Sequence, residues 1–600
     1  MSVAEKTNDG GGKLLPVWPT LGLVALVLLA MGRVLGNDFS TWDDPHTLYQ
    51  HVAFNPPEWG KLLSFWDPRN VEAGLWVPVT YTLWGLLAQG AYLSQADDWG
   101  ARLNPAVFHA ASLAVHVIST LLVFVLVRRV LLGRERAEEM MDEGVWSVDG
   151  RAWLGAAVFA VHPLQVESVA WTSGMKDVLW GMWALAAVVC YMKWVDGGGR
   201  GEAGEGAKRR AWWWAGLACF VLGTLSKPTA MVTPALAFAV HALVLGGGWR
   251  GAVRGTWAWF IFVPVVMVWT RLAQPGGGVP TLGLPMRPLI ALDTLAFYAA
   301  KVVWPVGLAF DYGRTPAVIL ESGAIWWTWV VPVVLGAAAV WVWKRGKPQD
   351  AVVPLAGAWF VIACSPVLGM TPFLFQYFST VSDHYVYASM AGVAMLVGWG
   401  AGRVGARGKV AVGVALGVVL AFCVVRSVQQ MGTWRDSDAL YAQALKVNPR
   451  SFATMTNIGG MYLYKADRAG GGAAGRADYK RAMVYYDRAV ATREDYSVAW
   501  DFRAVALLKL GEREEGIRSV RKALELSSKV PRGVRGPMMM SNIMMGQFFV
   551  EQGRLAEGLP YLEAAKKENE ELGTLPAVEA AKLESLLDQA RGGPTTRPVG

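Results

Sequence analysis

The amino-acid sequence predicts an all-α membrane protein, a polytopic helix bundle followed by a solenoid of helical repeats. Of its 600 residues, 54% are hydrophobic and only 17% are charged, whereas soluble proteins average about 25% charged residues. Apolar runs long enough to cross a bilayer, roughly 20 residues each, recur between residues 14 and 428. Downstream of Arg435 the charge rises and the apolar residues follow the helical period.

The net charge of +9 reflects membrane topology, and no nucleic-acid partner is expected. Most Lys and Arg residues lie in short loops between apolar runs, which is how membrane proteins set their orientation. The cysteines lack the spacing of a zinc site or a disulfide framework. All four lie inside apolar runs and do not report the compartment: Cys190, Cys219, Cys364 and Cys423.

The apolar runs predict about eleven spans. The first, 14–36, is longer than the core of a signal peptide and no cleavage pattern follows it, so it is expected to be retained. Counting 290–310 as a span would move two basic loops to the other side and break the positive-inside bias. We therefore expect 290–310 to be a re-entrant or interfacial segment. The other predicted spans are 104–130, 151–167, 175–195, 211–226, 228–246, 256–271, 324–343, 351–370, 384–402 and 408–428.

An odd number of spans places the two ends of the chain on opposite sides of the membrane. The basic loops put the N-terminus in the cytoplasm and the C-terminus outside. Spans rich in Gly, Ala, Val and Trp, joined by short loops, indicate a bacterial inner-membrane protein with periplasmic repeats. The predicted parts are a cytoplasmic segment 1–13, a membrane domain 14–432 with outer loops 37–103 and 272–323, an extracytoplasmic repeat domain 433–592 and a disordered tail 593–600.

The C-terminal domain predicts tetratricopeptide repeats. Small residues such as Gly459, Ala504 and Gly546 recur at pair-packing positions beside aromatic residues, with a spacing near 34 residues. The expected antiparallel pairs are 451–466 with 479–492, 497–510 with 513–527, and 538–552 with 555–569, after a connecting helix 437–447. A solenoid is a binding surface. It therefore serves either as a platform for partner proteins or as a groove for an acceptor polypeptide.

Ionisable residues gather at the outer ends of the predicted spans. Such groups are costly at membrane depth and usually line a cavity or a site. One carboxylate of the Asp43–Asp44 pair is a candidate general base for an acceptor hydroxyl. The other is a candidate to orient the acceptor or to bind Mg²⁺ or Mn²⁺, and Asp44 is the candidate metal ligand. The candidate cations for a departing phosphate are Lys176, Lys227, Arg314 and His384.

The order of motifs along the chain is the Asp43–Asp44 loop, Asn104–His116, His162–Trp171 with Lys176–Asp177–Val178, Ser226–Lys227–Pro228, and Trp304–Pro305 with Asp311–Tyr312. This succession resembles the polytopic GT-C glycosyltransferases. It is most similar to the transmembrane and tetratricopeptide-repeat O-mannosyltransferases and their bacterial relatives.

The resemblance implies inverting transfer of mannose or a similar hexose from a polyprenyl-phosphate donor to a hydroxyl, with the acidic pair at the active site. The implied partners are the donor, membrane lipids and a protein or glycan acceptor, in particular protein Ser/Thr. The chain departs from the family in having Val77 for the Arg of an Arg-Pro motif and His384 for an Arg. A histidine holds phosphate less strongly near neutral pH. The implied substrate-binding residues are His162, Glu167, Lys176, Asp177, Lys227, Asp311, Tyr312, Asp383, His384 and Tyr385.

Two other functions fit the same composition. A membrane-anchored repeat scaffold without catalysis would tolerate neutralisation of both Asp43 and Asp44. A carrier or flippase for lipid-linked sugars would place polar residues along the span centres, whereas here they gather at the outer ends.

Overall fold

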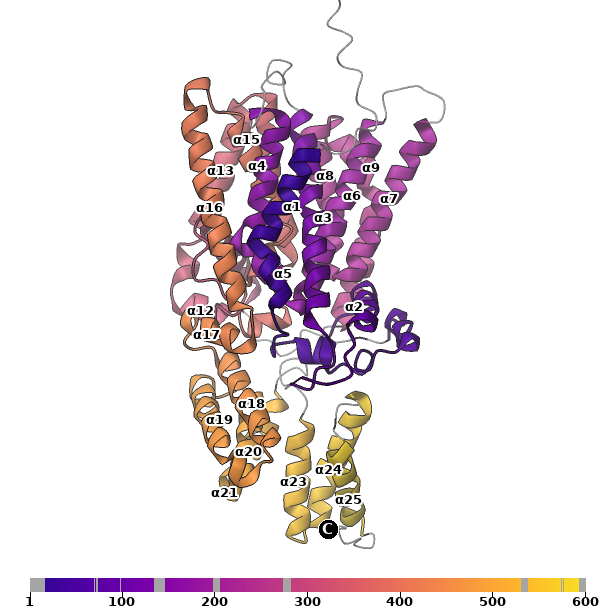
Figure 1. Cartoon of the computed structure of the whole chain (residues 1–600), viewed down its shortest axis with the longest axis vertical. Helices are drawn as coiled ribbons and strands as arrows, with labels where there is room; N and C mark the ends of the chain where they lie inside the picture. Colours follow the sequence, from indigo (N-terminus) through magenta and orange to yellow (C-terminus); the bar gives the residue numbers. More distant parts are fainter. Residues whose placement is uncertain are drawn as a thin grey trace, which may run out of the picture.

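The structure, a computed structural model, describes residues 17–69, 71, 74–97, 99–133, 146–197, 205–273, 282–529, 538–572, 575 and 577–592. The predicted cytoplasmic segment 1–13 and the tail 593–600 lie outside these residues. Across the described ranges the chain forms helices, with two isolated β-bridges and no strand. This confirms the predicted all-α class. Figure 1 shows a bundle of long helices with shorter C-terminal helices at its lower end.

The bundle is that of a multi-pass membrane protein. Seven helices among the described residues are long and apolar enough to cross a membrane. A further pair, α9 (Gly248–Phe260) and α10 (Phe262–Ala273), qualifies as one span across a 41° bend. The seven are Val17–Gly36, Pro105–Leu132, Thr172–Asp196, Pro228–Leu245, Ala324–Arg345, Gln349–Val367 and Ala406–Thr433.

Three of the eleven expected spans fall short of these criteria. The helices α4 (Val148–Val161) and α15 (Met390–Ala401) have 14 and 12 residues, about 21 and 18 Å, less than the roughly 30 Å of hydrocarbon. Both are largely buried between longer helices, so they lie away from lipid. The third, α7 (Glu205–Ser226), begins with a basic run and three Trp that lower its hydropathy. All three run alongside the long helices in Figure 1.

The segment 290–310 is not among the spanning helices. Most of it forms α11 (Arg287–Val303), which buries one face through Ile290, Asp293 and Tyr298. Asp293 is fully buried and accepts two hydrogen bonds from Arg314 at 2.8 and 2.6 Å. A one-sided helix that buries a paired charge is in keeping with the prediction that 290–310 does not cross the membrane.

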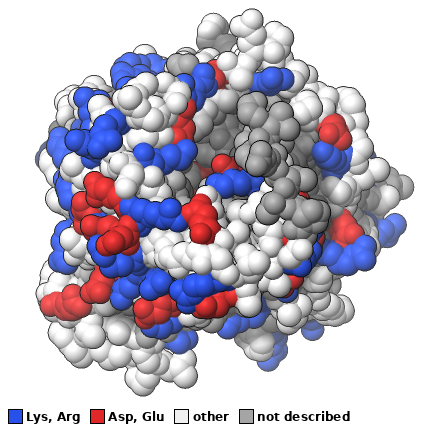
Figure 2. Space-filling view, turned by 90° about the horizontal axis from the view of Figure 1, so that it is seen from below, with Lys and Arg blue, Asp and Glu red and all other residues white. Residues whose placement is uncertain are grey.

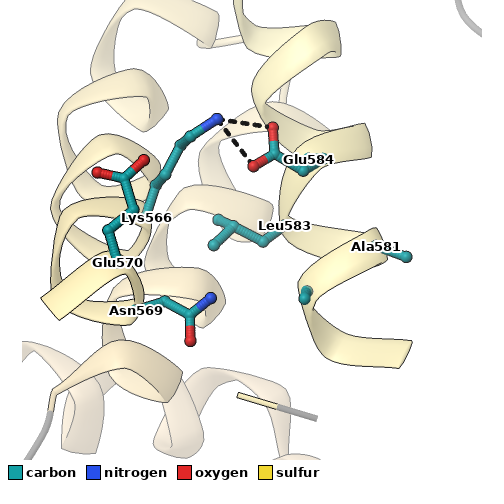
Figure 3. A pocket seen from close by; sticks show the side chains of 7 residues that line it. Lys566, Asn569, Glu570, Ala581, Leu583 and Glu584 are labelled. Atoms are coloured by element: carbon teal, nitrogen blue, oxygen red, sulfur yellow. Dashed lines mark hydrogen bonds and ion pairs between the residues drawn. The ribbon is translucent and has the colours of Figure 1, made fainter. Parts of the chain in front are cut away.

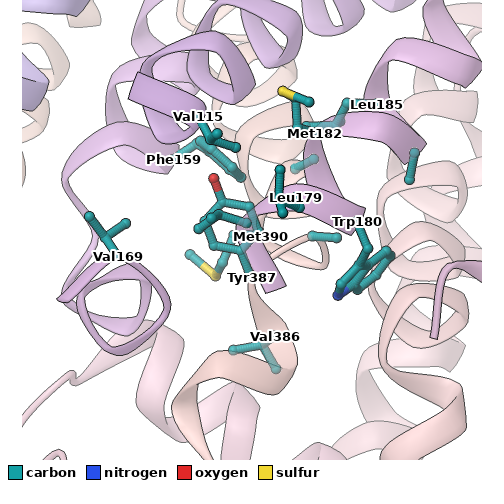
Figure 4. Packing of buried hydrophobic residues seen from close by; sticks show 14 of the residues in the cluster. Val115, Phe159, Val169, Leu179, Trp180, Met182, Leu185, Val386, Tyr387 and Met390 are labelled. Carbon is teal, nitrogen blue, oxygen red and sulfur yellow. The ribbon is translucent and has the colours of Figure 1, made fainter. Parts of the chain in front are cut away.

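Figure 4 shows part of the apolar core, formed by α3 (Pro105–Leu132), α4, α6 (Met175–Asp196) and segment 386–390. The Tyr387 side chain lies at its centre, and its hydroxyl is 2.9 Å from Nδ1 of His116. A Cβ at Gly181 would lie 2.7 Å from the Tyr387 ring. This close packing fixes the start of α6 against the segment that carries His384 and Tyr385.

The C-terminal helices lie at the same end of the bundle as loop 37–103, opposite the start of α1 (Val17–Met31) (Figure 1). The connector α17 (Ser437–Val447) follows the last long helix, α16 (Lys409–Thr433). Consecutive helices pack in pairs as expected, and the assignment to tetratricopeptide repeats stays a prediction. The pairs are α18 (Phe452–Arg468) with α19 (Gly472–Thr492), α20 (Ser497–Leu510) with α21 (Arg513–Ser527), and α23 (Met539–Glu551) with α24 (Leu555–Leu572), followed by α25 (Ala577–Ala590).

Two features of the array differ from the expected pattern. The residues between the first two expected helices are mostly helical, because α19 begins at Gly472. The helix α25 is additional to the expected pairs. Seen from the array end, basic and acidic side chains are interspersed (Figure 2), and several form bridges between helices. Arg503, for example, binds Asp487 at 2.7 Å and Glu515 at 2.6 Å.

We predict that Gly155→Ala destabilises the protein. A Cβ at Gly155 on α4 would lie 2.3 Å from the carbonyl oxygen of Ala394 on α15. Small residues at such crossings allow helix backbones to pack in membranes, and overpacking costs about 1–3 kcal/mol. The control Gly336→Ala adds a methyl with no atom within 4 Å. Thermal unfolding in detergent should show a lower midpoint for Gly155→Ala alone, and equal midpoints for the two variants would contradict this packing.

Candidate functional site

The Asp44 carboxylate is buried and fully hydrogen-bonded. Its Oδ2 accepts from Ser40 N at 2.8 Å and Ser40 Oγ at 3.0 Å, and its Oδ1 accepts from Ser173 N at 3.0 Å and Ser173 Oγ at 2.5 Å. Burial raises the pKa of Asp44 to about 6, and these hydrogen bonds limit the rise. Asp44 therefore joins loop 37–103 to the connection between α5 (Val166–Ala170) and α6.

These hydrogen bonds bear on the expected Mg²⁺ or Mn²⁺ at Asp44. A carboxylate oxygen offers two lone pairs, and four donors occupy both oxygens of Asp44. Within the described ranges, no group of three His, Cys, Asp or Glu side chains could hold a metal. Asp44 as it stands does not fit the role of a metal ligand.

The neighbouring Asp43 is half-buried, and its carboxylate differs in having no hydrogen bond or ion pair with any described residue. Its backbone carbonyl accepts from His46 N and Thr47 N, both at 3.1 Å, and so starts a short helical turn. Asp43 lies close enough to Lys176 and Tyr385 to interact with them electrostatically. Of the two adjacent acids, Asp43 is therefore the one whose carboxylate has no hydrogen-bond donor among the described residues.

Two lysines lie near this turn, because Lys176 interacts electrostatically with both Asp43 and Lys227. Lys227 Nζ is 2.6 Å from Asp177 Oδ1, and their side chains are 12% and 2% exposed. The second oxygen of Asp177 is buried without a described partner. Lys176 Nζ lies 5.6 Å over the ring of Trp171 and has no ion-pair partner among the described residues. Asp177 thus neutralises the charge of Lys227, whereas Lys176 forms no ion pair with a described carboxylate.

Glu167, Ser382 and His384 form a buried triad from two connections. Ser382 Oγ donates to Glu167 Oε1 at 2.6 Å, and His384 Nδ1 contacts the same carboxylate oxygen. The His384 ring centroid lies 4.3 Å from that of Tyr385. A carboxylate on one ring nitrogen fixes the orientation of an imidazole, so Glu167 holds His384 in one position.

Asp383 and Tyr312 form a second buried pair. Tyr312 donates its hydroxyl hydrogen to Asp383 Oδ1 at 2.7 Å. Burial, and then the charge of Glu167, raise the pKa of Asp383 well above its ordinary value. Lys301, which the sequence analysis did not identify, lies near Asp383 and donates to the carbonyls of Val306 and Gly307 at 2.6 and 3.2 Å.

Three candidates make structural contacts away from this group. His162 Nε2 lies 3.0 Å from the carbonyl of Val302, and its Nδ1 accepts from Leu164 N. Arg314 is occupied by its paired contact with Asp293, described above. Asp311 accepts hydrogen bonds from Asn448 Nδ2 at the end of α17, at 3.3 Å, and from Ser451 Oγ at the start of α18, at 2.5 Å.

The serines that donate hydrogen bonds to the candidate carboxylates were not predicted from the sequence. Ser40, Ser173 and Ser382 each bond a candidate carboxylate, but a serine in a polar connection carries no signal of its own. Ser173 lies between two motifs that were identified, and that position is the only hint the sequence offers.

A cavity of about 250 Å³ lies elsewhere, between α24 and α25 (Figure 3). Two of its lining residues form a salt bridge, with Lys566 Nζ 2.8 Å from Glu584 Oε1. All of its lining residues lie on α24 and α25, and none belongs to the group around Asp43. The cavity therefore contributes nothing to the group around Asp43.

Comparison with known proteins identifies relatives, although no family model matches the chain. The chain is 19% identical over 458 residues to protein O-mannosyl-transferase F38B6.6 of Caenorhabditis elegans, covering 73% of this chain and 59% of that protein. It is 22% identical over 500 residues to human protein O-mannosyl-transferase TMTC4, covering 74% and 64%. A mouse relative, protein O-mannosyl-transferase TMTC1, is 31% identical over 100 residues, 17% of this chain and 9% of that protein.

The chain thus spans 59–64% of the length of the first two relatives. The similarity to O-mannosyltransferases that the motifs predicted is confirmed by these matches.

We predict a pH dependence of stability that depends on Asp44. Its folded pKa of about 6 lies above the ordinary 3.8, so the folded state holds the proton more tightly than the unfolded state. The free energy of unfolding therefore falls as the pH rises from about 4 to about 6. Asp44→Asn removes this titration. The unfolding midpoint of the parent minus that of the variant, both measured in detergent, should fall over that interval and stay constant above pH 7. A constant difference from pH 4 to 7 would contradict this assignment.

Proposed function

We propose that this protein is a membrane glycosyltransferase that moves mannose or a similar hexose from a polyprenyl-phosphate donor to a hydroxyl of a polypeptide. The single observation that carries the proposal is the unpaired Asp43 carboxylate beside Lys176 at the outer ends of the helices. The named activity of the relatives supports the same reaction class.

In the proposed reaction, Asp43 accepts the proton of the acceptor hydroxyl. The acceptor oxygen then forms a bond to the anomeric carbon as the bond from that carbon to the phosphate oxygen breaks. The electron pair leaves with the polyprenyl phosphate. A single displacement of this kind inverts the anomeric centre. General-base catalysis of such a step contributes about 10²–10⁴-fold in rate.

The departing phosphate needs positive charge in a fixed place. Lys176 is the principal candidate, because Lys227 already pairs with Asp177 at 2.6 Å. His384, oriented by Glu167, is the second candidate. Asp44 acts through hydrogen bonds to Ser40 and Ser173 that hold the loop, so the proposal uses no cation at that residue.

The lipid surroundings follow from the exposed helices. On the helix Ala324–Arg345, exposed Trp326 and Trp327 lie near one end, and exposed Trp341 and Trp343 near the other. Tryptophan is enriched at both membrane interfaces, so this helix is suited to lie against lipid, where the polyprenyl chain resides. We further propose an inner-membrane location, a cytoplasmic N-terminus and a periplasmic array whose groove holds the acceptor polypeptide.

The first test is Asp43→Asn, assayed by transfer of radiolabelled sugar from polyprenyl phosphate to peptide in membranes. Loss of the base should lower kcat by about 10²–10⁴-fold. The control Glu514→Gln removes an acid whose side chain is 93% exposed on α21 and should retain parental transfer. Unchanged transfer in Asp43→Asn would contradict the catalytic role and favour the scaffold.

The second test concerns the phosphate. We expect Lys176→Met to lower kcat/KM for the donor by about 10²-fold, in the range measured for loss of one charge-stabilising donor. Lys176→Arg keeps the charge and should recover part of that loss. Steady-state rates at varied donor concentration measure both effects. A change confined to the KM of the acceptor would assign Lys176 to acceptor binding and overturn its phosphate role.

A further inference from the structure

The connector helix α17 lies directly against the turn that carries Asp43. Thr41 N donates to Ser437 Oγ at 2.9 Å, and Thr41 Oγ1 donates to the same oxygen at 3.0 Å. Thr41 Oγ1 also lies 3.0 Å from the hydroxyl of Tyr441. Three residues earlier, Asp38 N donates to the carbonyl of Arg435 at 2.8 Å. Hydrogen bonds from the start of α17 therefore fix the backbone two residues before Asp43.

The other side of the turn is held by the membrane domain. Asp44 binds Ser173 through both the backbone and the hydroxyl, and Thr47 Oγ1 lies 2.6 Å from Ser173 Oγ. Asp43 thus lies between two sets of hydrogen bonds, which we call clamps. One comes from α17 and the other from the connection before α6. Because its own carboxylate has no described partner, these two clamps are what determine its position.

The α17 clamp is rigid and well buried. Ser437 and Tyr441 are 5% and 1% exposed. The side chain of Asp436 caps the helix by accepting from Ala439 N at 2.8 Å. Buried hydrogen bonds of this kind restrict a loop more strongly than exposed ones, because an unpaired buried donor or acceptor pays its full desolvation cost.

The array is attached to the same turn by aromatic contacts. The ring centroid of Trp42, the residue before Asp43, lies 4.5 Å from that of Phe310 and 6.0 Å from that of Phe378. Phe378 in turn lies 5.8 Å from Phe452 on α18 and 6.2 Å from Tyr496, just before α20. A continuous path of packed side chains therefore runs from the Asp43 turn to the first two helix pairs.

We propose that Ser437 and Tyr441 are positioning residues for Asp43, through which the repeat domain acts on the transfer step. They hold Thr41 so that the neighbouring carboxylate meets the acceptor hydroxyl. The proposal rests on the proposed function, in which Asp43 is the base. A displacement of about 1 Å in a reacting group costs about 10²-fold in rate, so small shifts of α17 are enough to alter catalysis.

The test uses Ser437→Ala and Tyr441→Phe in the full-length protein. Each should lower kcat about 10–100-fold and leave the KM for the polyprenyl-phosphate donor within about twofold, because the proposal gives both residues the single task of positioning Asp43. Thr41→Ser keeps the bonded hydroxyl and should stay close to the parent, whereas Thr41→Val should match Ser437→Ala. The controls Ser528→Ala and Thr492→Val remove hydroxyls that bond only within their own helices.

The decisive measurement repeats Ser437→Ala in an Asp43→Asn background. A residue that acts through Asp43 should cost nothing further once the base is gone, because effects on one shared group are not additive. An equal loss in both backgrounds, or an unchanged kcat in Ser437→Ala, overturns the positioning role. Parental transfer by Asp43→Asn alone would refute the proposed function instead, so the two failures are distinguishable.

Discussion

The hydrogen bonding of the buried Asp44 carboxylate is the constraint on which the rest of the site depends. It joins loop 37–103 to the connection before α6 through both of its oxygens. That connection brings Lys176 and Asp177 next to the loop, and Asp177 in turn holds Lys227. Since burial makes an ionised carboxylate costly, the four donors are needed to keep it in place.

This arrangement divides two adjacent acids between two tasks. Consecutive residues of a turn face different ways, so Asp44 points into the protein and Asp43 is left without a described partner. A group that must exchange protons is more useful when no strong donor competes for its oxygens. In the proposed reaction, Asp44 therefore holds the turn and leaves Asp43 to act as the base.

The sequence predicted the all-α class and candidate residues that share one end of the bundle. Of these candidates, the structure brings together Asp43, Lys176, Asp177, Lys227 and Tyr385. The lengths of the apolar runs and the positions of the charged residues indicate these features directly. Sequence could not separate the roles of Asp43 and Asp44, because the distinction depends on Ser40 and Ser173, which carry no pattern. Nor could it show that Asp311 bonds Ser451, because the two residues are distant in sequence. The short buried helices α4 and α15 show that apolarity measures burial in protein as well as in lipid.

The sequence distance between Thr41 and Ser437 has a consequence for biosynthesis. Chains emerge from the ribosome N-terminus first, so the Asp43 turn is made long before either of its clamps. Ser173 follows only after the long helix α3 and the short α4, and Ser437 only after the last long helix, α16. The turn therefore cannot be fixed in its final geometry while the chain is still being inserted. A nascent or truncated chain would hold lipid-facing helices without an ordered Asp43 turn, so the transfer proposed above would require the complete membrane domain.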